Sequence, residues 1–339
     1  MEKERTPRTA KPTEKVNDST VESDWYGDVA PELPRVTLER FGTVPAPRTL
    51  GEYVQTVTAI ATKLSKVVAW RGQVDVSWGV HSGAARRVMQ QRWIEPRPDY
   101  IGGVLRRAGM DDSEFEELDE IWRKAEQPAA VKRQLRDYEA SLLDQARAAG
   151  HDNEPNGHRL GDFELFGLLQ HHGAATPLVD VSRNAMIGLW FAAETLPETT
   201  GLVMAVADAG VVPAQSTIES ANWHEVRDRL PQGKALWWVP RRISSRMAAQ
   251  EAAFVTTPFW DQPWGSLDLP GTIMWKSESS PGDQPSVAFI AIAPELKAAL
   301  HEAGRLGVTA YDGTTIYPDL PGFARYNGAG MDITMPRVR

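Results

Sequence analysis

A short polar run followed at once by an apolar segment constrains this chain more than any other feature. Residues 170–184 read QHHGAATPLVDVSRN, and residues 185–193, AMIGLWFAA, carry apolar side chains all round. A segment that is apolar on every side predicts a buried helix. Polar groups beside a core are costly to bury unless they find hydrogen-bond partners or take part in chemistry. The run is therefore either a hydrogen-bonded turn between two core elements or part of a functional site.

A second polar feature lies upstream, where Arg71 follows the short, mainly apolar stretch 66–70 and precedes Gly72. The apolar stretch predicts a buried strand with Arg71 at its end. A guanidinium group presents several donors to a phosphate, although a structural salt bridge is the alternative role. Because ligands bind where polar clusters meet the ends of apolar elements, we expect Arg71 and the run 170–184 to share one cleft.

Composition limits the classes of function. The net charge of −8 argues against a surface that binds nucleic acid everywhere, but it leaves room for a local basic site. One stretch, residues 86–107, could be such a site or else the solvated face of a helix. Its arginines are Arg86, Arg87, Arg92, Arg97, Arg106 and Arg107. The chain has no cysteine, which excludes thiolate catalysis and cysteine-ligated metals.

The histidines do not stand at the spacing of a helix-borne ligand pair, so we expect no metal site. No apolar run is long enough to span a bilayer, and we expect a soluble, cytoplasmic protein. Residues 1–45 are rich in charge, Thr and Pro and predict a flexible tail, which Trp25 and Tyr26 could anchor. Residues 46–330 form the expected domain, and residues 331–339 a second tail.

Periodicity predicts an α+β fold, because the strands do not alternate strictly with helices. Within an insertion at about residues 95–160, a capping box at Ser113 and a proline at position 128 predict a hairpin of two helices. Other helices are expected at 49–64, 163–169, 185–193 and 294–303. Strands are expected at 66–70, 201–207, 236–239, 253–256 and 287–292.

Four motifs, spread from about residue 50 to residue 327, together resemble the bacterial FRG domain family. They are Trp70-Arg71-Gly72-Gln73 with Trp78 and Arg86; Gln170-His171-His172-Gly173 with Thr176, Leu178, Asp180, Ser182, Arg183 and Asn184; Arg246 to Gln250 with Phe254; and Tyr317-Pro318-Asp319-Leu320. One departure is Ala252, where the family usually has glycine.

The family pattern is in turn similar to that of ADP-ribosyltransferases of the Arg–Ser–Glu type. This resemblance implies a core of antiparallel strands with flanking helices and NAD as the co-substrate. Arg71 would be the first element, and Ser182, or Thr176, the second. Gln250-Glu251 would be the third, although its spacing departs from the expected Gln-x-Glu.

The resemblance implies a role for each residue. Arg71 would grip the pyrophosphate, and Glu251, or else Asp180, would bond the ribose hydroxyls and activate the acceptor. His171 or His172 could contact ribose or adenine. Only one of the two is expected to line the site, because neighbours in a strand point to opposite faces. The same alternation could place Gln250 inside and Glu251 in solvent. The remaining expected cofactor contacts are Gly72, Gln73, Gly173 and Thr176.

The implied function is transfer of ADP-ribose to a protein or nucleic acid, as in toxins or phage defence, where an antitoxin or immunity protein could be a partner. Two alternatives remain open. The protein could be an NAD glycohydrolase, which would share every site residue. It could instead be a non-catalytic module that binds a nucleotide or nucleic acid.

Overall fold

The computed structural model describes residues 25–26, 32–64, 66–90, 112–154, 157–214, 218–240, 244–271 and 285–326; for residues 112–127 and 219 it describes the backbone alone. The calls for residues 1–24 and 331–339, and for Arg92, Arg97, Arg106 and Arg107, lie outside these ranges.

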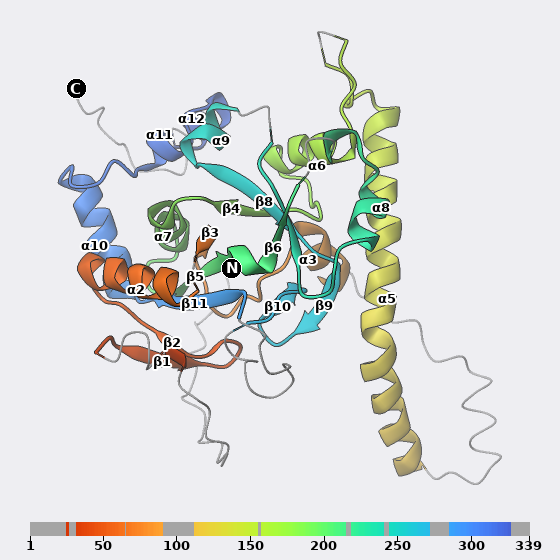
Figure 1. Ribbon diagram of the computed structural model, residues 1–339, viewed down its shortest axis with the longest axis horizontal. Helices are drawn as coiled ribbons and strands as arrows, with labels where there is room; N and C mark the ends of the chain where they lie inside the picture. The colour runs from red at the N-terminus through yellow and green to blue at the C-terminus, as the bar shows by residue number, and fades with distance from the viewer. Residues whose placement is uncertain are drawn as a thin grey trace, which may run out of the picture.

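A mixed sheet of seven strands forms the centre of the fold (Figure 1). Its order is β11 (Val287–Ile292), β5 (Gly201–Ala207), β3 (Val67–Gln73), β4 (Val179–Ser182), β8 (Ala252–Thr256), β7 (Ala235–Trp238) and β6 (Val211–Pro213). All neighbours are antiparallel except β6 and β7. Helices and strands are thus combined as the predicted α+β class requires.

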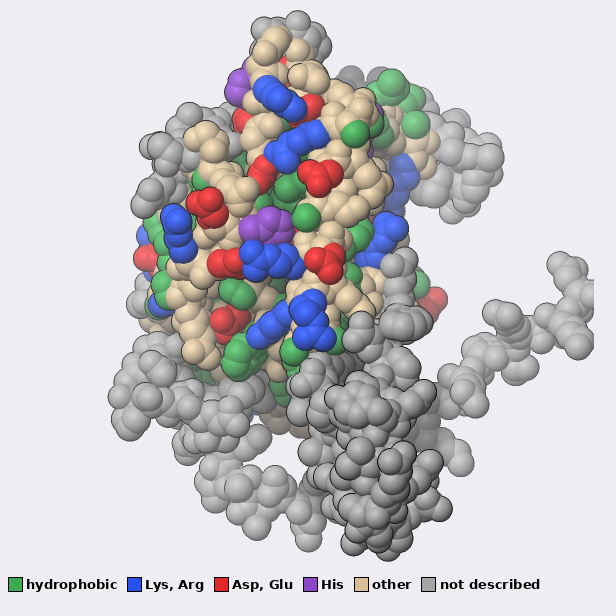
Figure 2. All heavy atoms as spheres, turned by 90° about the vertical axis from the view of Figure 1, so that its right-hand side faces the viewer, with side chains coloured by type: hydrophobic (Ala, Val, Ile, Leu, Met, Phe, Trp, Pro, Cys, Tyr) green, Lys and Arg blue, Asp and Glu red, His purple; other side chains and the backbone are tan. Residues whose placement is uncertain are grey.

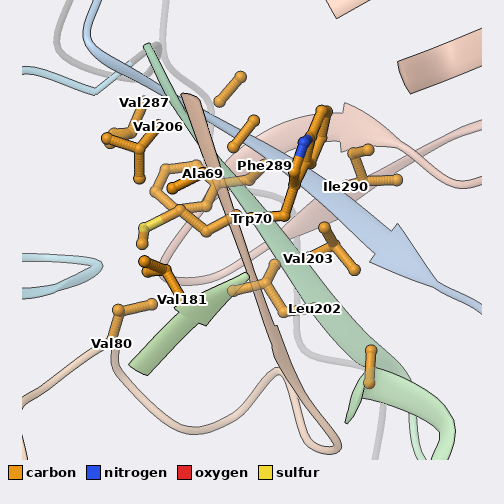
Figure 3. Packing of buried hydrophobic residues seen from close by; sticks show 14 of the residues in the cluster. Ala69, Trp70, Val80, Val181, Leu202, Val203, Val206, Val287, Phe289 and Ile290 are labelled. Carbon is orange, nitrogen blue, oxygen red and sulfur yellow. The ribbon is translucent and has the colours of Figure 1, made fainter. Parts of the chain in front are cut away.

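Two small hairpins accompany the sheet. One joins β1 (Arg35–Leu38) to β2 (Gly42–Pro45), and the other joins β9 (Phe259–Gln262) to β10 (Gly265–Leu267). Phe289 of β11 packs against Phe41 at 4.9 Å and against Trp264 at 5.3 Å between ring centroids. The hairpins therefore help to bury one face of β11. Figure 3 shows Phe289, Trp70 and their aliphatic neighbours in this core.

The helices divide between the two halves of the sheet. On the side of β3, β5 and β11 lie α2 (Leu50–Lys63), α7 (Ala185–Ala193) and α10 (Pro294–Arg305). Beside β4, β8 and β7 lie α6 (Asp162–His171), α8 (Trp223–Asp228) and part of α5 (Asp112–Ala148), which share a second apolar cluster. The short helices are α3 (Gly83–Gln90), α9 (Ser245–Ala249), α11 (Gly313–Ile316) and α12 (Leu320–Tyr326), with single turns at Asp208–Gly210 and Ile218–Ser220.

Helix α7 lies directly on β3, because glycine occupies both sides of the contact. A Cβ atom on Gly72 would lie 2.0 Å from the carbonyl oxygen of Gly188 and 2.6 Å from the nitrogen of Ala192. A Cβ atom on Gly188 would lie 3.2 Å from the Cβ of Trp70. Real Cβ atoms do not approach backbone atoms as closely as the first two distances, so the packing of α7 requires glycine at position 72.

The sheet opens between β3 and β4, where Trp70 and Ser182 form the one paired position between these strands. β3 remains paired with β5 as far as Gln73, and β4 remains paired with β8 back to Val179. The two strands therefore separate beyond Trp70, and the residues that follow it face an opening.

The predicted helical hairpin is wrong. A single helix, α5, runs from Asp112 to Ala148 and contains Pro128 (Figure 1). A proline inside a helix removes one hydrogen bond, but it need not end the helix when packing continues beyond it. Here Val131 and Leu135 pack against α3, and Leu143 packs in the cluster with α6. Within the described ranges, no helix is both long and apolar enough to cross a membrane.

The tail predicted for residues 1–45 is also wrong over its last part, since residues 35–45 form the β1–β2 hairpin. The signal in the sequence was weak: a few β-branched residues flank Gly42, whose φ of 64° suits a tight turn. The expected anchor is present. Trp25 and Tyr26 are buried, and the backbone nitrogen of Phe289 donates to the hydroxyl of Tyr26 at 2.8 Å.

Gly72→Ala is expected to lower the free energy of unfolding by about 3 kcal/mol or more, because the added methyl group meets backbone atoms that cannot move independently. Urea unfolding measures this. Gly51→Ala is the matched control: its Cβ would meet one side-chain oxygen at 3.9 Å, so stability should be retained. Equal stability of the two variants would contradict the close packing of α7.

Candidate functional site

The opening between β3 and β4 leads to a cavity of about 280 Å³. All four sequence motifs contribute to it, which confirms that Arg71 and the run 170–184 share one cleft. The polar side chains that line the cavity are Arg71, Gln170, His171, Asp180, Ser182, Arg246, Gln250 and Tyr317. Apolar walls come from Trp70, Val181, Phe191, Met247 and Phe254.

Arg71 reaches across the opening from β3 to β4. Its Nη1 donates to the backbone carbonyl oxygen of Asp180 at 2.8 Å. Its Nε is buried, and no group in the described part of the chain accepts a hydrogen bond from it. Burial lowers the pKa of the guanidinium, while the nearby Asp180 carboxylate raises it. One donor of this cation is therefore left unpaired by the described residues.

Asp180 supplies a carboxylate to the same cavity. Its Oδ2 accepts a hydrogen bond from Nε2 of Gln170 at 2.8 Å. The side chain is open to the cavity, but it lies deep within the protein, and this burial raises its pKa. Arg71 and the Gln170 hydrogen bond act in the opposite direction, favouring the ionised form. The carboxylate is thus fixed in position while remaining open to a ligand.

Thr176 does not line the cavity. It is fully buried, and its hydroxyl donates to Oε1 of Gln170 and accepts from the backbone nitrogen of Leu178. The side chain therefore holds Gln170, which in turn holds Asp180. Thr176 therefore orients residues that line the cavity and does not itself contact a ligand there.

Ser182 lines the cavity, but its hydroxyl proton is already committed. The Oγ atom donates to the carbonyl oxygen of Gln250 at 2.8 Å and accepts from the nitrogen of Asn184 at 3.1 Å. Ser182 is 3% exposed. Its hydroxyl fixes the turn before β8 and the start of α7.

Glu251 lies away from the cavity, which Gln250 and Ala252 line on either side of it. Its carboxylate accepts a hydrogen bond from Nδ2 of Asn184 at 2.8 Å, so it is bound to protein rather than free in solvent. The φ of Glu251 is +44°, in the left-handed region that side chains other than glycine rarely adopt. This backbone turn directs Gln250 inward and Glu251 outward.

Of the remaining residues expected to contact a ligand, some line the cavity and others do not. His171 lines the cavity, with its Nε2 at 3.6 Å from Oδ2 of Asp319, and burial lowers its pKa. His172 is exposed and lies at the end of α6. Gly72 lines the cavity, but Gln73 donates instead to the carbonyl oxygen of Trp78 at 2.7 Å. Gly173 lies beyond the cavity.

The third and the closing motif supply site residues to which sequence reasoning assigned no role. Nη2 of Arg246 donates to Oδ1 of Asp319 at 2.8 Å, and its guanidinium lies 5.1 Å from the ring centroid of Tyr317. Phe191, expected in the core, is partly buried and lines the cavity. The motif resemblance was the one signal that could have identified Arg246 and Tyr317.

The described side chains of α5 and α8 do not form a continuous basic patch. Figure 2 shows basic and acidic side chains interspersed on this face. Arg136 pairs with Asp228 at 3.1 Å and Arg229 with Glu225 at 3.5 Å. In the ranges that the structure describes, no cluster of histidine and acidic residues could hold a metal ion.

Thr176→Val should lower the free energy of unfolding by about 1–3 kcal/mol, because Gln170 and the nitrogen of Leu178 both lose a buried partner. Thr176→Ser should lower it less, since the hydroxyl is kept. Thermal denaturation of the two variants distinguishes hydrogen bonding from packing. If packing alone mattered, the valine variant would be the more stable of the two.

Comparison with known proteins supports the first of the resemblances. A model of the FRG domain matches residues 66–200. No curated protein and no solved structure matches the chain. The match includes Arg71, Gln170, Asp180 and Ser182, whereas Arg246, Gln250 and Tyr317 lie beyond its end. The predicted resemblance to the FRG domain family is thus confirmed over residues 66–200.

Proposed function

We propose that this protein cleaves NAD at the bond between nicotinamide and ribose and transfers ADP-ribose to a macromolecular acceptor. The observation that carries the proposal is the pairing of Arg71 with Asp180 in one cavity. Arg71 has an unused buried donor that suits a phosphate, and Asp180 is a carboxylate open to the same space. Aromatic walls from Phe191, Tyr317 and Phe254 suit the flat ring of a nucleotide base.

The reaction requires stabilisation of positive charge on the ribose. As the bond between the nicotinamide nitrogen and the ribose carbon breaks, its electron pair neutralises the pyridinium ring, and the ribose develops oxocarbenium character. The carboxylate of Asp180 would stabilise this charge electrostatically. A nucleophilic atom of the acceptor would then bond to the ribose carbon, and its proton would pass to Asp180.

Asp180 takes the role that the resemblance assigned first to Glu251. Glu251 bonds Asn184 outside the cavity, whereas Asp180 lies inside it beside Arg71. In this scheme Arg71 binds the pyrophosphate and His171, whose lowered pKa favours the neutral ring, contacts a ribose hydroxyl. Ser182 and Gln250 are positioning residues, because their mutual hydrogen bond shapes the cavity wall.

Nicotinamide release should fall at least about a hundredfold in Arg71→Ala and in Asp180→Asn, the range typical of a lost electrostatic stabiliser. Glu251→Gln should retain most of the activity, because this side chain does not line the cavity. Chromatography of nicotinamide after incubation with NAD provides the measurement. Equal loss in Glu251→Gln would return the catalytic role to Glu251.

Folding controls accompany these variants. Trp190 is 4% exposed, so Trp190→Ala should cost about 3–5 kcal/mol of stability. Arg71→Ala should cost clearly less, since it removes one hydrogen bond to Asp180. Labelled NAD incubated with separate pools of protein, RNA and DNA identifies the acceptor. Release of nicotinamide without labelling of any pool would identify a glycohydrolase, and no release at all would favour a binding module.

The pH dependence provides a separate test of Asp180. Its carboxylate must be ionised to act, and burial raises its pKa above the usual value of about 3.9. Activity should therefore be lost on acidification at a higher pH than an ordinary aspartate would give. Gln170→Leu removes a hydrogen bond that favours the ionised form, so the acid limb of kcat/KM should move to still higher pH. An unmoved limb would exclude Asp180 as the titrating group.

A further inference from the structure

A second cavity, of about 370 Å³, meets the first at Arg71, Gln170 and Asp180, which line both. Its walls are helix α3 on one side and the loop at residues 173–175 on the other. The nitrogen of Ala84 donates to the carbonyl oxygen of Thr176 at 2.9 Å, which ties α3 to the end of this loop. The cavity is thus a built part of the fold, continuous with the candidate site.

The second cavity is lined by cations for which the described part of the chain provides no carboxylate within ion-pair distance. Arg86 and Arg87 of α3 both contribute to it, and Arg71 forms its boundary with the first cavity. Among the described residues, no carboxylate lies within ion-pair distance of Arg86 or Arg87, and Asp180 is the one acidic residue in the lining. Three guanidinium groups around one carboxylate leave an excess of positive charge.

One of these arginines is held in place before any ligand binds. The guanidinium of Arg87 lies 5.2 Å from the ring centroid of Tyr138, and the hydroxyl of Tyr138 donates to the carbonyl oxygen of Ala175 at 2.7 Å. A cation held by an aromatic ring loses less conformational entropy on binding an anion. Both Arg86 and Arg87 are exposed to solvent, so an anion can reach them directly.

His81 reports the electrostatic character of the same cavity. Burial, together with the charges of Arg86, Arg40 and Arg71, lowers the pKa of His81 to about 4. The imidazole is therefore neutral at neutral pH even though it lines a polar cavity. Burial, the largest cause, disfavours a charge of either sign, so the positive potential of the cavity is indicated by the smaller contributions of the three arginines.

We propose that the second cavity binds phosphoryl groups of the donor dinucleotide, with its adenosine diphosphate half there and its nicotinamide riboside half in the first cavity. The inference rests on the proposed function. The first cavity, at about 280 Å³, is slightly smaller than the lower limit of about 300 Å³ for ligand pockets, and a dinucleotide needs more space. Arg71, whose buried Nε has no acceptor among the described residues, lies where the two cavities meet and would contact the pyrophosphate at the end of the adenosine diphosphate half.

The test is calorimetric binding of ADP and of nicotinamide riboside to the full chain. In Arg86→Ala/Arg87→Ala, the dissociation constant for ADP should rise at least tenfold, whereas that for nicotinamide riboside should be unchanged. Arg229→Ala is the matched control, because Arg229 is exposed on the surface and pairs with Glu225. Its ADP binding should equal that of the wild type. Replacing Arg87 by Lys instead of Ala (Arg87→Lys) should recover part of the affinity for ADP, because the positive charge is kept. Melting temperatures confirm that each variant is folded.

Three results would overturn the inference. The first is that ADP does not bind the wild type. The second is that ADP binds equally well without Arg86 and Arg87. The third is that binding of a single-stranded oligonucleotide depends on these arginines whereas binding of ADP does not. The last result would assign the phosphoryl groups to an acceptor. Because ADP binding is measured without turnover, the outcome is independent of the nicotinamide assay: arginine-dependent ADP binding without NAD cleavage would retain the cavity and reject the proposed reaction.

Discussion

The contact between α7 and β3 is the constraint on which the rest of the structure depends. With glycine at positions 72 and 188, the helix backbone lies against the strand backbone with no side chain of either residue between them. Helix α7 follows β4 within two residues, so its seat on β3 also fixes where β4 lies. The position of β4 sets the opening in which Arg71 and Asp180 meet. A methyl group at position 72 would therefore affect the site as well as the core.

The sequence predicted the elements whose signals are local. Continuous apolar runs gave the strands at 201–207 and 287–292 and the helix at 185–193 with the bounds that the structure has. It failed where the outcome depends on distant packing. Pro128 stays within one helix because the apolar residues beyond it pack on other elements. The β1–β2 hairpin forms on β11, far along the chain, which composition alone could not indicate.

The site was predicted in its location but not in all its assignments. Arg71 and the polar run share a cavity, as expected, although Arg71 lies within β3 rather than at its end and the run begins at the end of helix α6. Which carboxylate lines the cavity was harder to predict. Strand alternation left open whether Gln250 or Glu251 faces inward, and the left-handed backbone at Glu251 has no clear local signal in the sequence. Thr176 and Ser182 could not be ranked from sequence, since their roles depend on which partners the fold brings to their hydroxyl groups.

The hydrogen bond to the hydroxyl of Tyr26 bears on whether copies of the protein can associate through the edge of the sheet. β11 is an outer strand of the sheet, and an outer strand with free N–H groups is a template on which another chain can add. Tyr26 accepts the hydrogen bond of Phe289, and the carbonyl oxygen of Pro270 accepts those of Ser286 and Val287. At the opposite margin, β6 is three residues long and ends in Pro213, which has no N–H. An incoming strand would have to displace the aromatic anchor before it could pair, so residues far from the candidate site protect the sheet against edge-to-edge aggregation.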